Sequence, residues 1–365
     1  MGAVIAVAAG VMLLVTALWD AFSTIVLPRS VSFGLRPSRM FGQACWRVWR
    51  RLGRLTTSRA ARQSFLSFFG PFSILLLLSL WAVMLLFAFA FLHWGLGTRL
   101  NESEGEFGVL LYMSGTTFFT LGLGDVVPLN GLGRALVVLE VGTGIVFLAM
   151  IIGYLPLLDQ AYAQREVGVH LLESRAGSPP SAMLLLQRFG TLENAAVFYN
   201  ILLEAERWSA EVSQSHLAHV GLVYYRSQHL GQSWLVTLTT ILDACALVMV
   251  TAERKGIVRQ AEAAFRMALR VAVDMSRLLR VTAEQAGGES CRLPPEELAR
   301  LREVLRADDI VLSPEAEMRL GRLRQLYEAR VVALADWLMA PLPPWVPPNA
   351  GPEGEPDFTT LVDGR

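Results

Sequence analysis

The sequence predicts an all-α membrane protein, in which three transmembrane helices and one short re-entrant helix precede a cytoplasmic helical domain. Two observations lead to this fold class. Of the 365 residues, 53% are hydrophobic and 18% are charged, and the mean hydropathy is +0.43, which is too apolar for an ordinary soluble chain of this length. The excess is confined to three apolar runs before Gln160, whereas the remainder has the amphipathic pattern of a helical soluble domain.

Each of the three runs is long enough to cross a bilayer, which takes roughly 20 apolar helical residues. They extend from Gly2 to Leu27, from Phe72 to Leu96 and from Leu132 to Leu158. Asp20 lies inside the first run and Glu140 inside the third. A removable signal peptide is the alternative for the first run, but this run lacks a basic start and stays apolar beyond Asp20.

The charges of the loops set the orientation of the spans. The segment from Pro28 to Gln63 carries nine arginines and no acidic residue, which places it in the cytoplasm under the positive-inside rule. The loop after the second span is acidic, with Glu102, Glu104 and Glu106, and is expected outside. The N-terminus then lies outside and the third span returns the chain to the cytoplasm. We therefore predict a multi-pass protein of the cell (plasma) membrane.

The same patterns predict five parts along the chain. In chain order these are a first transmembrane helix (1–27), a basic cytoplasmic or interfacial segment (28–66), a membrane module (67–160), a cytoplasmic α-helical domain (161–340) and a disordered tail rich in proline, glycine and acids (341–365). Residues 45–55 mix arginine with tryptophan and leucine at helical spacing. This mixture favours a helix on the inner leaflet, with its rings at the headgroups and anionic lipid as its partner.

A short apolar segment from Phe107 to Thr120 separates the second and third spans. It is too short to cross the bilayer, so we expect it to be re-entrant. It runs into Thr120-Leu121-Gly122-Leu123-Gly124-Asp125. Two glycines separated by one residue allow the backbone to alternate through positive φ, so that successive carbonyls point to one side. Four such loops around an axis could form rings of oxygen atoms that replace the hydration shell of a cation.

This arrangement resembles the pore module of the potassium-channel superfamily, in which an outer helix, a pore helix, a selectivity-filter loop and an inner helix follow one another. The family filter reads Thr-Val-Gly-Tyr-Gly-Asp, and this chain keeps four of those six residues: Thr120, Gly122, Gly124 and Asp125. The resemblance covers roughly Phe72 to Leu158. It implies a homotetramer that conducts potassium, with no cofactor apart from a permeant monovalent cation, K⁺. It also implies that Gly144, ten residues beyond Arg134, is the gating hinge of the inner helix.

Two departures from the family pattern leave alternatives open. Leu121 and Leu123 replace the valine and the tyrosine, and leucine cannot donate the hydrogen bond with which that tyrosine braces the filter. Thr116 stands where the pore helix often has an acid that partners the filter aspartate. A nonselective monovalent-cation channel is therefore one alternative. A membrane-anchored signalling or scaffold protein with a degenerate pore is another.

Acidic residues outside the filter have two expected roles. Glu102, Glu104 and Glu106 are expected to concentrate cations at the outer vestibule. Glu140 lies at membrane depth in the inner helix, where a carboxylate is costly and usually faces protein or water. It either tunes cation occupancy or gating, or makes a structural hydrogen bond to a threonine or serine of the pore helix.

The cytoplasmic half reads as a helical domain without an assigned ligand. Apolar residues recur at three- and four-residue spacing from Ser181 to Ala340, which predicts about six helices. The segment from Trp234 to Val250 is apolar for nearly the length of a span. We expect it to be a buried core helix, with Arg226 as the partner of Asp243, and a fourth span is the alternative.

No catalytic constellation and no basic nucleic-acid surface stands out in the sequence, so we predict neither an enzyme nor a nucleic-acid partner. His216, His219 and His229 lie near several glutamates and could form a metal site. Ordinary helix residues remain the favoured interpretation, and no metal site is predicted.

Overall fold

The computed structural model describes residues 1–25, 37–101, 106–190, 194–227, 232–282, 284, 291–308 and 310–347. Within these residues the regular structure is helical, and the one β pairing is an isolated bridge between Leu100 and Pro128. The all-α fold class predicted from the sequence is confirmed. The helices divide into two compact units, one made of residues 1–55 and 68–160, the other of residues 56–67 and the chain from residue 161 onward.

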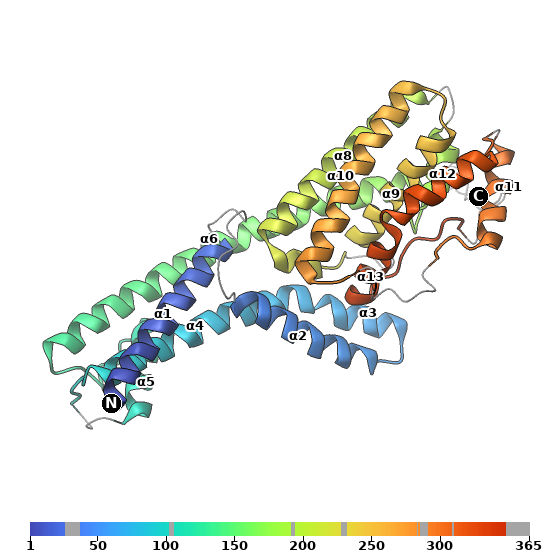
Figure 1. The fold of residues 1–365 in the computed structure, drawn as a ribbon. Helices are drawn as coiled ribbons and strands as arrows, with labels where there is room; N and C mark the ends of the chain where they lie inside the picture. The colour runs from blue at the N-terminus through green and yellow to red at the C-terminus, as the bar shows by residue number, and fades with distance from the viewer. Residues whose placement is uncertain are drawn as a thin grey trace, which may run out of the picture. The chain divides into compact units, whose positions relative to one another are not determined.

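The first unit contains the apolar helices of the N-terminal half (Figure 1). These are α1 (Gly2–Ile25), α2 (Pro37–Arg54), α4 (Phe69–Gly95), α5 (Phe107–Phe118) and the first part of α6 (Gly131–Ala176). α1, α6 and the helical stretch Ala60–Gly95, which ends with α4, are each long and apolar enough to cross a membrane. α5 is the short apolar helix between α4 and α6. This is the order of spans predicted from the sequence.

Small residues bring α1 and α4 into close contact. A Cβ atom at Gly10 would lie 2.8 Å from the carbonyl oxygen of Ala88, and one at Gly95 would lie 2.6 Å from a methyl carbon of Val7. Both distances are too short for a real side chain, so glycine is required at each end of the contact. Backbone approach over small residues is the usual way in which membrane helices gain van der Waals contact, because lipid provides no hydrophobic force between them.

A buried carboxylate ties α2 to α1 and α4. Asp20 is 1% exposed and accepts hydrogen bonds from the backbone N–H of Ser38 (3.0 Å), the hydroxyl of Ser38 (2.9 Å) and the indole Nε1 of Trp81 (2.8 Å). Three donors offset the cost of removing the charge from water, and the carboxylate also meets the positive end of the α2 dipole. A charge that is unusual in a membrane span thus serves as a structural anchor.

The sequence suggested that the tryptophans of α2 lie at the lipid headgroups, but at least one of them is buried in the protein. Trp46 is 1% exposed, and its ring centroid lies 4.8 Å from that of Phe69 in α4. Trp49 lies beside Phe72 in the same way, at 5.4 Å. The rings pack on α4 because α2 needs a partner for its apolar side. The exposed face carries arginines among apolar side chains: Arg47, Val48, Arg51, Leu52 and Arg54.

The second unit is a helical bundle that includes a 3₁₀ turn. Besides the last part of α6 it contains α3 (Arg59–Ser67), α7 (Ala182–Phe189), α8 (Ala195–Ala218), η1 (Val220–Tyr224), α9 (Trp234–Thr251), α10 (Lys255–Leu279), α11 (Pro295–Ala307), α12 (Pro314–Gln325) and α13 (Glu328–Leu338). Proline at the first position of α11 and α12, with acids in the first turn, starts both helices as their sequences indicate. α8 and α10 run side by side, and α9 contacts both (Figure 1).

α9 is the core of this bundle. Every residue from Trp234 to Val248 is buried, and 83% of its most apolar stretch is covered by protein, against 17% for α1. Length and composition alone would allow α9 to cross a membrane. Its coverage by α7, α8, α10, α12 and α13 favours the core helix expected from the sequence, because a span presents most of its surface to lipid.

The prediction that Arg226 is the partner of Asp243 was wrong. Asp243 is 2% exposed and is bound by Arg292, at 2.6 and 3.3 Å, and by the hydroxyl of Tyr327 at 2.6 Å. Arg226 instead donates to Gln63 and to the carbonyl oxygens of Leu338 and Met339, at the end of α13 and just beyond it. Burial, with the neighbouring Asp243 charge, raises the pKa of Tyr327 well above its ordinary value, so its hydroxyl remains a donor.

The tail predicted to be disordered is in fact packed as far as Pro347. Trp345 is fully buried and Val346 is 2% exposed. The carbonyl oxygen of Trp345 accepts a hydrogen bond from Ser181 at 3.1 Å, and the guanidinium of Arg292 lies 5.8 Å from its ring centroid. Composition favoured disorder, but one large aromatic side chain offsets the entropy of ordering this short segment. Residues 348–365 lie outside the described residues.

Candidate functional site

The short helix α5 ends in a turn that leads directly into the segment from Thr120 to Asp125, called the glycine motif below. The N–H groups of Leu121 (2.8 Å) and Gly122 (3.3 Å) both donate to the carbonyl oxygen of Thr116, which lies in the last turn of α5. One carbonyl therefore holds the first two residues that follow Thr120. The helix C-terminus and the start of the motif form a single hydrogen-bonded unit.

The backbone of the motif alternates in φ. Thr120, Gly122 and Gly124 have φ of +57°, +58° and +77°, whereas Leu121 and Leu123 are not among the residues with positive φ. Positive φ at the two glycines agrees with the sequence-based expectation. Positive φ at Thr120 was not anticipated, since a β-branched residue adopts it at a cost of about 1–3 kcal/mol. No atom lies within 4 Å of a Cβ placed at Gly122 or Gly124, so glycine is needed there for conformation and not for space.

Asp125 is held by two residues that sequence reasoning missed. The hydroxyl of Tyr112, in α5, donates to its Oδ2 at 2.7 Å, and the amide of Asn101 donates to its carbonyl oxygen at 2.7 Å. The carbonyl of the Asn101 side chain in turn accepts from the N–H of Val127 at 2.8 Å. The pore helix thus supplies a tyrosine hydroxyl, one turn before Thr116, in place of the absent acid. Thr116 itself bonds the carbonyl of Met113.

The hydrogen bond from Tyr112 lowers the pKa of Asp125 below its ordinary value, and the N–H of Val126 at 3.0 Å acts in the same direction. Asp125 is therefore ionised at neutral and mildly acidic pH. A fixed negative charge lies directly after the last glycine of the motif. Its place there suits the attraction of cations.

The loop beyond the motif is fastened to the end of α4. The N–H of Leu129 donates to the carbonyl of Arg99 at 2.8 Å, beside the bridge between Leu100 and Pro128. Nε of Arg134, at the start of α6, donates to the carbonyl of Pro128 at 3.2 Å. The motif is thus held at its start by α5. The loop just after it is held by the residues that follow α4 and by the first turn of α6.

Gly144 of α6 lies against the end of α5. A Cβ atom at this position would be 2.2 Å from the carbonyl oxygen of Phe118, which is the last residue of α5. The rings of Phe118 and Phe147 are 5.7 Å apart at the same contact. The structure therefore gives Gly144 a packing role. Its role as a gating hinge remains a prediction.

Glu140 is fully buried one turn before Gly144. Its Oε2 lies 3.5 Å from Nε2 of His93 in α4, and both side chains are 0% exposed. Nδ1 of His93 is 2.9 Å from the hydroxyl of Thr98. The sequence suggested a threonine or serine of the pore helix as the structural partner, and Ser114 of α5 does interact with this carboxylate, together with the histidine of the outer helix. The role of Glu140 in cation occupancy or gating remains a prediction.

Glu106 is the one predicted vestibule acid that lies within the described residues. It is exposed and stands at the start of α5, where its carbonyl accepts the N–H groups of Val109 and Leu110 at 3.1 and 3.2 Å. Glu102 and Glu104 lie outside the described residues. For the part of the chain that is described, no group of three histidine, cysteine or acidic side chains is arranged to hold a metal ion.

Comparison with protein families agrees with this geometry. Residues 74–156 match a family model described as "Ion channel", a stretch that runs from α4 through α5 and the motif into α6. The comparisons with curated proteins and with solved structures gave no match. The match covers under a quarter of the chain and supports a channel-like pore module in this segment, and the several apolar helices indicate a multi-pass membrane protein. It does not extend to the second unit.

Proposed function

We propose that the protein is a homotetrameric cation channel of the plasma membrane that conducts potassium through the backbone of Thr120 to Asp125. The observation that carries this proposal is the alternation of positive φ at Thr120, Gly122 and Gly124, directly after a short helix that ends inside the membrane module. Alternating backbone conformations direct successive carbonyls to one side, and four copies would supply rings of oxygen to a dehydrated cation.

The surroundings of the motif support a rigid filter. Tyr112 and Asn101 hold Asp125, and Thr116 holds the start of the motif, so the loop is braced from the pore helix and from the outer loop. Backbone carbonyls held in place in this way can replace the hydration shell of a cation. The C-terminus of α5 adds a partial negative charge near the inner end of the motif, which favours a cation there.

A nonselective monovalent-cation channel is the second candidate, because of Leu121 and Leu123. Their side chains are 63% and 64% exposed in the single chain and offer no hydrogen-bonding group. The tyrosine that braces the family filter is thus missing from the motif itself. Tyr112 replaces part of that bracing from a different position, which favours retained selectivity.

The proposed orientation puts the N-terminus outside and the helical domain in the cytoplasm. Arginines on the exposed face of α2 support this, because basic residues next to spans remain on the cytoplasmic side and attract anionic lipid. α6 runs from Gly131 to Ala176 with Pro156 inside it, and it contributes residues to both units. We propose a non-enzymatic transport role for the protein as a whole.

Flux into liposomes tests the proposal, with the purified full chain and with potassium, rubidium and sodium in turn. Flux of potassium and rubidium without sodium supports a potassium channel, and equal flux of all three supports the nonselective alternative. No flux from intact tetramers supports a scaffold with a degenerate pore, and a protein that exists only as single copies overturns the proposal.

Two matched glycine variants locate the conduction path. Neither Gly122 nor Gly142 has an atom within 4 Å of a built Cβ, but only Gly122 has positive φ. Gly122→Ala should abolish flux, because alanine resists this conformation by about 1–2 kcal/mol in each of four copies. Gly142→Ala should conduct normally. Equal flux from both variants would show that ions do not pass the motif.

A further inference from the structure

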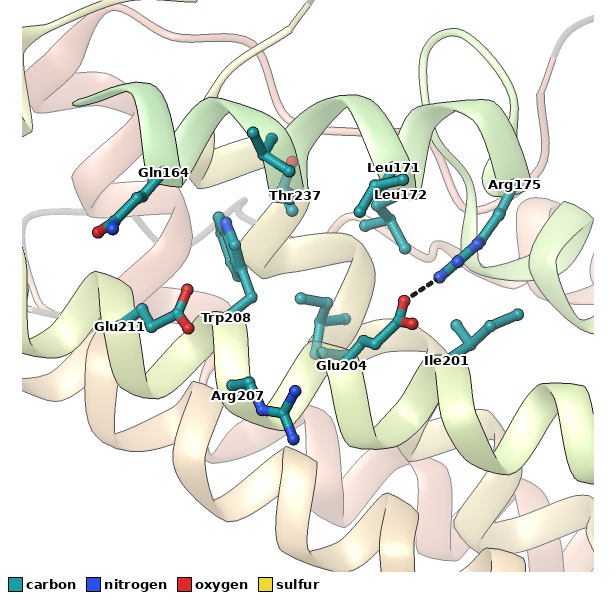
Figure 2. A pocket seen from close by; sticks show the side chains of 14 residues that line it. Gln164, Leu171, Leu172, Arg175, Ile201, Glu204, Arg207, Trp208, Glu211 and Thr237 are labelled. Atoms are coloured by element: carbon teal, nitrogen blue, oxygen red, sulfur yellow. Dashed lines mark hydrogen bonds and ion pairs between the residues drawn. The ribbon is translucent and has the colours of Figure 1, made fainter. Parts of the chain in front are cut away.

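A cavity of about 160 Å³ lies in the second unit, where the last part of α6 faces α8 and α9 (Figure 2). Its walls are largely apolar, with Leu171 from α6, Ala205 and Trp208 from α8, and Ile241 from α9. An apolar cavity of about 150 Å³ is large enough to hold a benzene ring. The cavity is partly open, so a ligand can enter from solution.

Trp208 forms a rigid wall of the cavity. A Cβ atom at Gly168 would lie 2.0 Å from Cδ1 of its indole, so the ring rests directly on the backbone of α6. The indole Nε1 donates to the carbonyl of Arg165 at 3.0 Å, and Trp208 is 6% exposed. The ring therefore cannot turn into the cavity. Its face is available to an aromatic ring or to a cation.

The floor of the cavity holds a hydroxyl group that has no hydrogen-bond partner. Thr237 of α9 is 1% exposed, and its Oγ1 bonds no other group. Figure 2 shows Thr237 between α6 and α8, near Trp208 and Leu172. Two neighbours on the same helix do not share this feature, because Thr239 donates to the carbonyl of Leu235 at 2.7 Å and Thr240 donates to a carbonyl of the α6–α7 connection at 3.2 Å. A buried hydroxyl left without a partner is unfavourable, and a polar group of a ligand would satisfy it.

The mouth of the cavity has acids at both ends. At one end Glu204 forms an ion pair with Arg175 (Figure 2). At the other end Glu211 of α8 faces Gln164 of α6, with the indole of Trp208 beside them. Arg207 also lines the cavity, on the same face of α8 as Glu211 and one helical turn before it. Glu211 is the acidic side chain at the end of the cavity next to the indole.

We propose that this cavity binds a small aromatic amine that carries a hydrogen-bonding group on its ring. The ring fills the apolar space beside Trp208, the ring substituent bonds the hydroxyl of Thr237, and the ammonium group lies between Glu211 and the indole. Because α6 also forms the inner helix of the pore module, binding should change channel opening. That consequence rests on the proposed function, whereas binding itself does not.

Three probes of similar shape test the proposal by calorimetric titration of the purified full chain in detergent. They are tyramine, phenethylamine, which lacks the hydroxyl, and 4-hydroxyphenylpropionate, which reverses the charge. We expect tyramine to bind most tightly and the acid to bind least. No saturable binding of tyramine at millimolar concentration, or tighter binding of the acid than of the amine, would overturn the proposal.

Variants of α9 test the role of the buried hydroxyl. Thr237→Val should weaken the binding of tyramine about fivefold and leave that of phenethylamine unchanged. The midpoint of thermal unfolding should stay equal or rise, since the lost hydroxyl has no partner. Thr240→Val is the matched control and should bind both amines as the unmodified chain does. Equal loss of both amines in Thr237→Val, or no loss of either, contradicts the proposed contact.

Liposome flux separates this proposal from the proposed function. Saturable tyramine binding without any ion flux would leave the cavity assigned and remove the channel. Flux that persists without tyramine binding would leave the channel and remove the ligand site.

Discussion

Replacement of Gly144 by alanine tests the contact between the inner helix and the end of the pore helix. The new Cβ atom would lie 2.2 Å from the carbonyl oxygen of Phe118, a backbone atom that cannot turn away. To restore a contact of ordinary length, α6 must move from α5 by about 1 Å. Overpacking of this kind costs about 1–3 kcal/mol, and the gain in helix propensity returns about 1 kcal/mol of it. We therefore expect net destabilisation and a disturbed filter.

Gly142→Ala is the control, because it raises helix propensity by the same amount. No other atom lies within 4 Å of its new Cβ. Thermal unfolding of the detergent-solubilised protein, followed by circular dichroism, should place the midpoint of Gly144→Ala below that of Gly142→Ala. Potassium flux should fall only in the former. If Gly144→Ala unfolds at or above the temperature of Gly142→Ala, the close contact and the reasoning built on it are wrong.

Two further predictions concern residues that the structure pairs. Tyr112→Phe removes the hydrogen bond that lowers the pKa of Asp125, so the pKa of Asp125 should rise. On acidification Asp125 would then lose its charge at a higher pH, and flux should be lost at a higher pH than in the unmodified chain. Superimposable acid limbs of the flux–pH curves would contradict this. Arg292→Met leaves the carboxylate of Asp243 buried without its cation, which should cost about 3–5 kcal/mol and lower the midpoint of thermal unfolding by several degrees. Asp243→Asn added to Arg292→Met should recover part of that loss, and a double variant no more stable than the single one would argue against the pair.

The membrane module could be predicted from the sequence because its signals are local. Three apolar runs set the spans, and the short run before the motif set α5, since a helix of 12 residues is too short to cross. The positive φ of Gly122 and Gly124 followed from residue type, because glycine alone adopts it freely. These features need no knowledge of distant contacts.

The partners of the charged residues could not be predicted in the same way. Tyr112 and Asp125 are 13 positions apart, and Asp243 and Arg292 are 49 apart, so each contact depends on how the intervening chain folds. Sequence reasoning chose Arg226 for Asp243, whereas the fold brings Arg292 to it. A carboxylate binds whichever donor the packing brings within reach, and sequence distance does not decide this.

The second unit shows the same limit. The burial of α9 was expected from its apolar length and from Asp243 at its centre. The cavity beside it was not, because a lining residue such as Thr237 has the same sequence character as Thr239, whose hydroxyl is satisfied within the helix. The difference lies in what packs opposite each hydroxyl, which only the three-dimensional structure provides.

Crystals or particles of the protein soaked in rubidium provide the most direct test of ion coordination by the motif. We expect rubidium on a fourfold axis, within coordination distance of the carbonyl oxygens of residues 120–124, and none in Gly122→Ala. Four copies whose motif carbonyls turn away from the axis, with no rubidium between them, would contradict the channel outright.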